Sequence, residues 1–241
     1  MCNYRVSPNG KVALAYASKL NWSVFPLHTP KGKLCSCYNP NCKSTGKHPR
    51  TKNGLKSAST NLDVINGWWK KWPDANIAIA TGQQSGFVVL DIDPRHGGED
   101  SLNLLINQYG PLPETIQAIT GEGGRHILFK NPGYVRNRTN ILPGLDVRGE
   151  GGYIVVAPSL HACGKRYEWE LSSRPLSVAL YYMPDWLLQM IVDPVVEKPA
   201  KKPDDYWIKI IQGVGEGRTE HVRCFPFRVL AKAWDSGSYS L

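Results

Sequence analysis

The chain has 241 residues, of which 41% are hydrophobic and 20% are charged, as in an ordinary folded protein. Its 29 Lys and Arg residues outnumber its 20 Asp and Glu residues, and the formal charge of +9 favours a polyanionic partner such as nucleic acid without requiring one. The sequence has neither the run of about 20 apolar residues that spans a membrane nor the apolar core of a signal peptide. We therefore expect a cytoplasmic protein without a membrane partner.

The first third of the chain is expected to form two helices and a strand around one long loop. Residues 12–20 have helical spacing, and residues 23–27 are typical of a short strand. Residues 61–72 return to helical spacing, with Leu62 on the apolar side. The loop between them, residues 28–59, is rich in Cys, Lys, Gly, Asn and Pro. A loop of this length inside a compact domain usually needs a function or an internal staple.

The middle of the chain is expected to contain many short strands, each bounded by Gly or Pro, together with two helices. Strand pairs mixed with helices indicate an α+β fold rather than a regularly alternating parallel sheet. The expected strands are 76–81, 86–93, 115–120, 125–130, 145–148, 153–157 and 166–169, and the expected helices are 99–109 and 184–192.

The C-terminal part is expected to lie outside the first domain, which would cover residues 1–194. Residues 195–205 (VVEKPAKKPDD) are charged and carry prolines, so they are typical of a linker. Residues 206–241 contain one helical pattern and are too few to bury a core of their own. We expect them to be the start of a second, helical domain that is truncated by the end of the chain.

The most informative stretch is FVVLDID at residues 87–93. Side chains alternate along a strand, so Asp91 and Asp93 are expected on one face and the apolar residues between them on the other. Two neighbouring carboxylates repel each other unless they share a cation, and oxygen ligands suit Mg²⁺ or Mn²⁺. The alternative is a strand end in solvent, where Asp-x-Asp-Pro begins a turn.

Asp146 is a candidate third ligand, because it lies in another short strand between glycines. Phosphoryl transfer by two metal ions needs several carboxylates that converge from different strands. Asp91, Asp93 and Asp146 together fit that need. Taken alone, Asp146 is equally compatible with an exposed turn.

The segment TGEGGRH at residues 120–126 joins two expected strands. Gly123 and Gly124 allow the backbone to approach an anion closely, and Arg125 and His126 add side-chain donors for phosphate oxygens. A flexible hairpin turn with a surface histidine is the alternative. Beside a carboxylate pair, the combination indicates a site that polymerises nucleotides. His161, in contrast, is expected to be an ordinary loop residue.

Cys35, Cys37, Cys42 and His48 offer three thiolates and one imidazole within 14 residues. Three Cys and one His are an accepted ligand set for structural Zn²⁺, which would staple the 28–59 loop. For His48, a core or phosphate-facing position is the alternative. The lysines and arginine around the cluster are compatible with contacts to DNA phosphate and equally with a solvated basic loop.

Several short signatures follow one another in a characteristic order. They are GKHP at 46–49, WPDANIA at 72–78, TG at 81–82, SG at 85–86, VLDID at 89–93, GGRH at 123–126, DVRG at 146–149 and GYIVVAPS at 152–159. With them, roughly residues 10–190 resemble the bifunctional primase-polymerase (Prim-Pol) N-terminal domains of the archaeo-eukaryotic primase superfamily. These domains occur in replication proteins of plasmids, phages and integrated elements. Residues 206–218 resemble the opening of the helical domain that follows such cores.

The resemblance implies a fold and an activity. The fold would be an RNA-recognition-type catalytic sheet with an additional α/β unit, here with a zinc-stapled loop. The activity would be template-directed nucleotidyl transfer from ribo- or deoxyribonucleoside triphosphates, which makes or extends primers. The implied partners are a single-stranded DNA template and nucleoside triphosphates, and a replicative helicase is a further candidate.

The resemblance also assigns roles to residues. Asp91, Asp93 and Asp146 would hold the catalytic Mg²⁺ or Mn²⁺ ions, and His126 would contact the incoming triphosphate. The remaining members of the expected nucleotide pocket are Thr120, Gly123, Gly124, Arg125 and Arg148.

Two other functions remain open at this point. The first is a phosphohydrolase that uses Asp91 as nucleophile and Asp93 as acid, although Pro94 and Arg95 follow where that chemistry normally has Thr or Val. The second is a non-catalytic zinc module that binds DNA. The carboxylates speak against it, because negative charge in a DNA-binding cleft is costly without metal.

Overall fold

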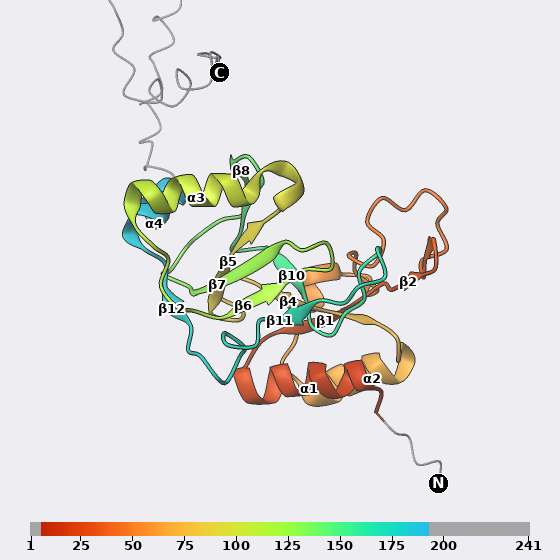
Figure 1. Ribbon diagram of the computed structural model, residues 1–241. Helices are drawn as coiled ribbons and strands as arrows, with labels where there is room; N and C mark the ends of the chain where they lie inside the picture. Colours follow the sequence, from red (N-terminus) through yellow and green to blue (C-terminus); the bar gives the residue numbers. More distant parts are fainter. Residues whose placement is uncertain (1–5, 193–241) are drawn as a thin grey trace, which may run out of the picture. The chain divides into compact units, whose positions relative to one another are not determined.

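The computed structural model describes residues 6–192, and the linker (195–205) and second domain (206–241) expected from the sequence lie outside that range. Within it, two sheets lie between two pairs of helices (Figure 1). Pairing is antiparallel throughout the main strands, and one short strand joins in parallel. The expected α+β class is therefore confirmed. None of the helices in the described range is long and apolar enough to cross a membrane.

The smaller sheet has the strand order β1-β4-β10 and is buried along its central strand. Its strands are β1 (Val24–Leu27), β4 (Asn76–Ala80) and β10 (Tyr153–Val156). Helix α1 (Pro8–Leu20) begins four residues before the expected start at residue 12, because Ser7 caps it and Pro8 occupies its first turn.

Helix α2 (Leu62–Lys71) packs beside α1 against this sheet. The Asn61 side chain caps it by accepting hydrogen bonds from two backbone N–H groups of its first turn. Ile65 and Trp69 are fully buried, and the Trp69 indole donates a hydrogen bond to the Ala75 carbonyl. Leu62 was expected on the apolar side, and that was wrong: it is 45% exposed because the helix turns its first residue toward solvent.

The larger sheet has the order β11-β6-β7-β5-β9-β8, with β12 paired in parallel to β7. Two of its strands were not expected from the sequence, β8 and β12. The strands are β5 (Phe87–Ile92), β6 (Gln117–Ile119), β7 (Arg125–Lys130), β8 (Arg138–Leu142), β9 (Leu145–Arg148), β11 (Glu168–Trp169) and β12 (Tyr181–Tyr182).

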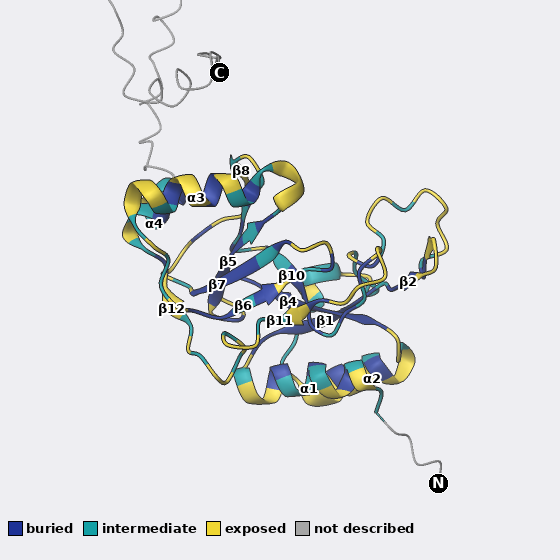
Figure 2. Ribbon diagram, viewed as in Figure 1, coloured by how far each residue is buried: buried dark blue, intermediate teal, exposed yellow. Residues whose placement is uncertain are grey.

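The two faces of β5 bury different parts of the core. Val88, Leu90 and Ile92 pack with the inner faces of α3 (Gly98–Tyr109) and α4 (Asp185–Ile191), and the outer face of α3 is exposed (Figure 2). Phe87 and Val89 face the other way, toward α1 and the smaller sheet. The expected alternation along this strand is confirmed for its apolar residues.

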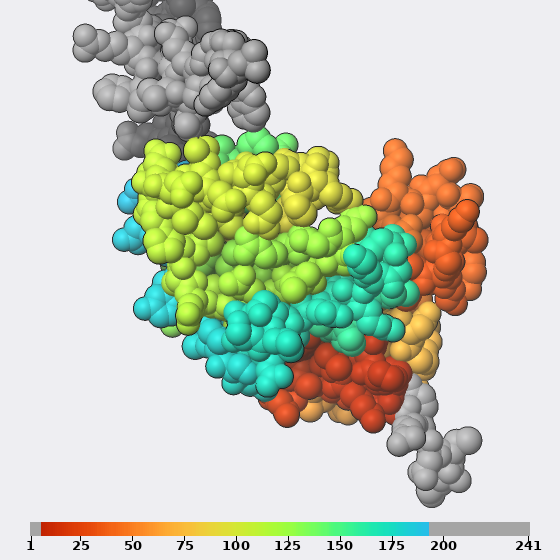
Figure 3. Space-filling view, in the orientation of Figure 1, coloured from red at the N-terminus to blue at the C-terminus, as the bar shows by residue number. Residues whose placement is uncertain are grey.

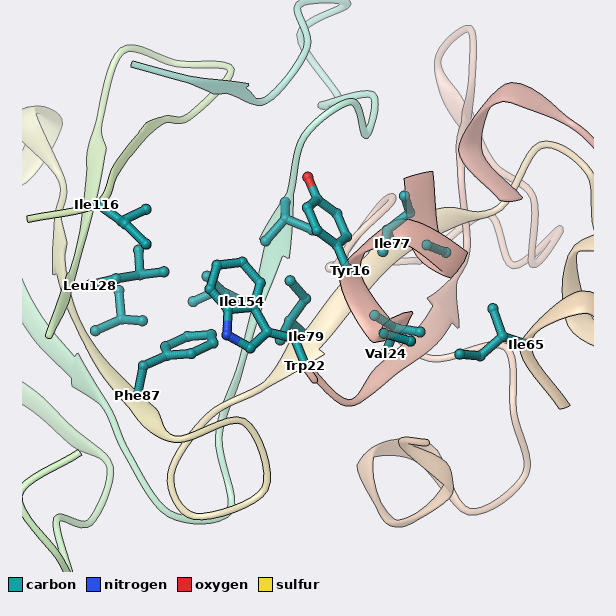
Figure 4. Packing of buried hydrophobic residues seen from close by; sticks show 14 of the residues in the cluster. Tyr16, Trp22, Val24, Ile65, Ile77, Ile79, Phe87, Ile116, Leu128 and Ile154 are labelled. Carbon is teal, nitrogen blue, oxygen red and sulfur yellow. The ribbon is translucent and has the colours of Figure 1, made fainter. Parts of the chain in front are cut away.

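The core on that second side is aromatic. The rings of Trp22 and Phe87 lie 4.9 Å apart between their centroids and meet nearly edge to face, with Ile79 and Ile154 beside them (Figure 4). Tyr16 from α1 completes the group. This core ties the two sheets together at the Phe87 end of β5 and leaves the Asp91 end free for other contacts.

The segment 28–59, called here the Cys-rich loop, contains only the hairpin of β2 (Pro30–Lys31) and β3 (Leu34–Cys35) and the short 3-10 helix η1 (Gly54–Ser57). It projects from the rest of the described chain (Figure 1). Backbone hydrogen bonds attach it to β1: the Arg50 N–H donates to the Pro26 carbonyl over 3.0 Å, and the Ser59 N–H to the Val24 carbonyl over 3.0 Å. The loop is therefore anchored at its base.

Candidate active site

Three polar side chains form a row across neighbouring strands of the larger sheet. In the strand register, Asp91 on β5 lies opposite His126 on β7 and opposite Asp146 on β9. Residues directly opposite one another share a face of the sheet, so all three project to the side away from α3 and α4. The Nε2 atom of His126 lies 3.5 Å from Oδ1 of Asp91. The structure thus brings together two of the three predicted carboxylates and the predicted histidine.

Arg148 connects the two carboxylates of this row. One of its terminal nitrogens lies 3.1 Å from Asp91 Oδ2 and 2.8 Å from Asp146 Oδ2. Asp91 and Asp146 are each about three-quarters buried, with 24% and 26% of their side chains exposed. Two partly buried carboxylates this close need a shared cation to offset their repulsion, and Arg148 supplies positive charge at that place.

Asp93 follows the end of β5 and is held by its own neighbours. Its Oδ1 accepts hydrogen bonds from the backbone N–H and Nε of Arg95, and its Oδ2 accepts from Arg95 Nη2 and His96 Nδ1. The hydrogen bonds from Arg95 hold the pKa of the Asp93 carboxyl well below its usual range. Asp93 lines the same cavity as Asp91 but is already fully paired.

A cleft of about 660 Å³ opens over the row. Volumes between about 300 and 1,000 Å³ are typical of small-molecule sites. Its floor is the larger sheet, and further walls come from β10, the Cys-rich loop and the segment after β10. Of the predicted site residues, the following line it: Asp91, Asp93, Asp146, Thr120, Gly124, His126 and Arg148.

Two predicted nucleotide-binding residues, Arg125 and Gly123, do not line the cleft. Alternation along β7 turns Arg125 to the face opposite His126, where its guanidinium pairs with both carboxylate oxygens of Glu99 on α3, at 2.9 and 2.6 Å. Gly123 occupies the turn with a positive φ of 84°. Position 124, in contrast, has no room for a side chain, because a Cβ atom there would lie 2.6 Å from the Ile92 carbonyl oxygen.

His126 is a buried ring with one unpaired nitrogen. Its side chain is 7% exposed, and burial lowers its pKa below the usual range. A histidine whose pKa is lowered in this way is uncharged at neutral pH. Its Nδ1 atom has no hydrogen-bond partner among the residues that the structure describes. A buried polar atom without a partner is costly, so the position of this ring beside Asp91 is not explained by its own hydrogen bonds.

The residues that line the cleft and that sequence reasoning did not assign to the site include Lys47, His161 and Tyr167. His161 is 5% exposed and lies with its Nε2 3.8 Å from Glu122 Oε2. The segment around it is placed by a hydrogen bond from the Leu160 N–H to Asn76 Oδ1 on β4. Neither periodicity nor spacing indicates this contact, because it joins residues 84 positions apart.

The four predicted zinc ligands also come together, away from the carboxylates. One donor atom from each of Cys35, Cys37, Cys42 and His48 lies within 4.8 Å of every other, and these four residues are called here the Cys/His cluster. His48 Nε2 is 3.3 Å from the Cys35 sulfur and 3.5 Å from the Cys42 sulfur. Three thiolates and one imidazole at such separations are a donor set that fits tetrahedral Zn²⁺.

The surroundings of one member of the Cys/His cluster, Cys35, favour the deprotonated thiol that metals require. Burial alone would raise the pKa of the Cys35 thiol, but backbone N–H groups of Cys37 and Gly46 and the His48 ring outweigh it. The pKa of Cys35 is lowered to about 6. The ring of His28 stacks on that of His48, with centroids 4.3 Å apart, and so helps to fix its orientation.

Comparisons with known proteins agree with the resemblance seen in the sequence. None of the curated proteins matches the chain. The family model for the N-terminal domain of bifunctional DNA primase/polymerases matches residues 13–186, which include the Cys/His cluster and every residue that lines the cleft. Because the match covers well over half of the 241 residues, the chain belongs to the bifunctional DNA primase/polymerase N-terminal family.

Proposed function

We propose that this chain is a template-directed nucleotidyltransferase that makes or extends primers during replication of a mobile element. The observation that carries the proposal is the row of Asp91, His126 and Asp146 in one cleft. Carboxylates for metal ions and a donor for phosphate oxygens are the groups that nucleotidyl transfer needs side by side. Membership of the primase/polymerase family supports the same activity.

The catalytic metal ions would be Mg²⁺ or Mn²⁺, held by Asp91, Asp93 and Asp146. Carboxylate oxygens suit these hard cations, and the two strands β5 and β9 bring Asp91 and Asp146 into adjacent positions. When bound, such ions polarise the phosphoryl oxygens and stabilise charge that develops during transfer. For Asp93 to serve as a ligand, its hydrogen bonds with Arg95 must be exchanged, and Arg95 would keep its ion pair with Glu122.

His126 would orient the incoming triphosphate. Its side chain lines the cleft beside Asp91, and its ring N–H can donate a hydrogen bond to a phosphate oxygen. Thr120 and Gly124 line the same cleft as His126. Arg148 adds positive charge beside Asp91 and Asp146. Arg125 takes no part in this account, because Glu99 holds it on the opposite face.

The two sheets would then correspond to the two halves of the Prim-Pol fold. We assign the larger sheet with α3 and α4 to the RNA-recognition-type catalytic sheet. The smaller sheet with α1 and α2 would be the additional α/β unit, and Zn²⁺ in the Cys/His cluster would staple the Cys-rich loop. The substrates would be nucleoside triphosphates and a single-stranded DNA template, with a replicative helicase as a further candidate partner.

The alternative functions fit less well. A phosphohydrolase would need Asp93 as a proton donor, but its contacts with Arg95 lower its pKa and keep it ionised at neutral pH. A non-catalytic DNA-binding module gives no reason for a cleft that contains Asp91 and Asp146 beside each other.

One assay separates these functions. The protein is incubated with primed or unprimed single-stranded template, Mg²⁺ or Mn²⁺, and labelled ribo- or deoxyribonucleotides. Our proposal predicts template-dependent incorporation of nucleotide into a longer strand. Release of inorganic phosphate without incorporation would indicate the phosphohydrolase instead, and DNA binding without either reaction would indicate the binding module.

A further inference from the structure

A lysine without an ionic partner reaches the cleft from the Cys-rich loop. Lys47 lines the same cavity as Asp91 and Asp146, which reach it from the larger sheet. Within residues 6–192, no acidic side chain lies within the 4.0 Å of its ammonium group that would make an ion pair. The other positive groups on the floor are occupied: Arg95 pairs with Asp93, and Arg148 with Asp91 and Asp146.

The charge of Lys47 acts on two buried rings at different walls of the cleft. Burial is the main reason why the pKa values of His126 and His161 lie below the usual range, and the Lys47 charge lowers both further. His126 belongs to β7, and His161 to the segment after β10. Lys47, His126 and His161 therefore border one space, the cleft itself. That space is where a ligand above His126 would lie.

The backbone at Lys47 is fixed from both sides. The Tyr153 hydroxyl on β10 donates a hydrogen bond of 2.9 Å to the Lys47 carbonyl, and the Asn76 side chain on β4 donates one of 2.9 Å to the Gly46 carbonyl. The next residue, His48, belongs to the Cys/His cluster. Figure 3 shows the Cys-rich loop (orange) as a lobe beside the teal segment that follows β10. The cluster and the cleft therefore share one short stretch of backbone.

A polyphosphate is the ligand that suits this lysine. Metal ions held by the carboxylates of the floor, together with a cation on another wall that has no carboxylate partner, would favour a multiply charged anion between them. Lysine is a common phosphate ligand, with three donors on a flexible stem. Lys43 and Lys52 belong to the same loop but do not line the cleft, so the loop's general basic character does not account for the position of Lys47.

We propose that Lys47 binds the polyphosphate of the incoming nucleotide and that the Cys/His cluster holds it at the cleft. The Cys/His cluster would then set nucleotide affinity in addition to stapling the loop. This inference rests on the proposed function, because it takes the ligand to be a nucleoside triphosphate.

The test compares binding of a nucleoside triphosphate and of the matching monophosphate, without template and therefore without turnover. Lys47→Met should weaken triphosphate binding about tenfold, as expected for loss of one charged hydrogen bond, and leave monophosphate binding nearly unchanged. Lys47→Arg keeps the charge and should retain most of the triphosphate affinity. Lys43→Met is the matched control, an exposed lysine of the same loop outside the cleft. Zinc content and melting temperature should be unchanged in all three variants.

The role of the Cys/His cluster is tested with Cys37→Ser and the double variant Cys37→Ser/Lys47→Met. If the cluster positions Lys47, loss of zinc from Cys37→Ser should weaken triphosphate binding, and adding Lys47→Met should weaken it little further. Fully additive losses would overturn the part of the inference that concerns the cluster. Should Cys37→Ser fail to fold, the Lys47→Met and Lys47→Arg pair still decides the role of the lysine.

The outcomes separate this inference from the proposed function. Wild-type affinity of Lys47→Met for the triphosphate, in a protein that incorporates nucleotides, would overturn the inference alone. Triphosphate binding that depends on Lys47 in a protein that incorporates no nucleotide would support the inference and overturn the proposed function. A wild-type protein that binds no triphosphate would contradict both.

Discussion

The carboxylate cleft and the Cys/His cluster are both suited to metal ions, but they are built in opposite ways. Asp91, His126 and Asp146 stand on three regular strands whose register and buried apolar residues place them before any ligand arrives. The Cys/His cluster stands on a loop with little regular structure, where the ligands themselves hold the chain together. Substitution of a residue in the cleft should therefore lower catalytic activity, and substitution of a residue in the cluster should lower the stability of the fold.

The largest effect is expected in the cleft. Asp91→Asn should lower nucleotide incorporation by about 10³-fold or more, because it removes a ligand for the catalytic metal ions. The same is expected of Asp93→Asn. Incorporation is measured by primer extension, with Asp100→Asn, an exposed residue of α3, as the control. The melting temperature of Asp91→Asn should not fall appreciably, since the change also removes a repulsion with Asp146. Substantial remaining activity in Asp91→Asn would contradict the assignment.

The opposite pattern is expected in the cluster. Cys37→Ser and Cys42→Ser should lose the zinc, about one ion per chain in the wild type. Their melting temperature should fall by roughly 5–10 °C, the size expected for the loss of a few kcal/mol. Activity per folded molecule should fall less than in Asp91→Asn. Elemental analysis and thermal unfolding check this, with Cys163→Ser outside the cluster as the control. If both cluster variants are as stable as the wild type, the metal has no structural role.

A smaller effect is expected for His126→Ala. The variant loses a hydrogen bond to the triphosphate, so KM for the nucleotide should rise about tenfold while affinity for the template changes little. Steady-state kinetics and a separate template-binding measurement distinguish the two. A fall in template affinity with an unchanged nucleotide KM would place His126 on the template side of the cleft.

The smallest effect concerns pH and the paired Asp93. Its folded pKa is depressed by Arg95, so the pair stabilises the fold at pH values above the ordinary Asp pKa of about 4, and this contribution is lost as the pH falls further. Asp93→Asn should therefore lower the melting temperature at pH 7 by only about 1–2 °C, since the pair is partly exposed. The difference from the wild type should shrink below pH 4. A difference independent of pH would mean that the pair contributes nothing through charge.

Much of the cleft could be predicted from the sequence, because local patterns specify it. Alternation along residues 87–93 places Asp91 on the face opposite Val88 and Leu90, as the structure has it. The same rule, applied to β7, places the adjacent residues Arg125 and His126 on opposite faces of the sheet. The sequence could therefore have predicted that only one of them lines the cleft. The register that sets Asp91 beside Asp146 is the alignment of β5 with β9, and no local pattern determines that alignment.

The parts that could not be predicted lack local signals. The Arg138–Leu142 strand has no alternation of buried and exposed residues, and Tyr181–Tyr182 is a pair of exposed tyrosines. Lys47 and His161 reach the cleft through hydrogen bonds between distant segments, from Tyr153 to Lys47 and from Leu160 to Asn76. Such contacts form only once β4 and β10, which are distant in the sequence, have paired in the smaller sheet.

The central claim, that the cleft rather than the Cys/His cluster holds the catalytic metal ions, is tested most directly by Mn²⁺ binding. Zinc-loaded wild type and Asp91→Asn are titrated with Mn²⁺ in the presence of a nucleoside triphosphate, and bound Mn²⁺ is counted by electron paramagnetic resonance. We predict that Asp91→Asn loses Mn²⁺ binding and keeps its full zinc content. If Asp91→Asn binds as much Mn²⁺ as the wild type, the row of Asp91 and Asp146 is not the metal site.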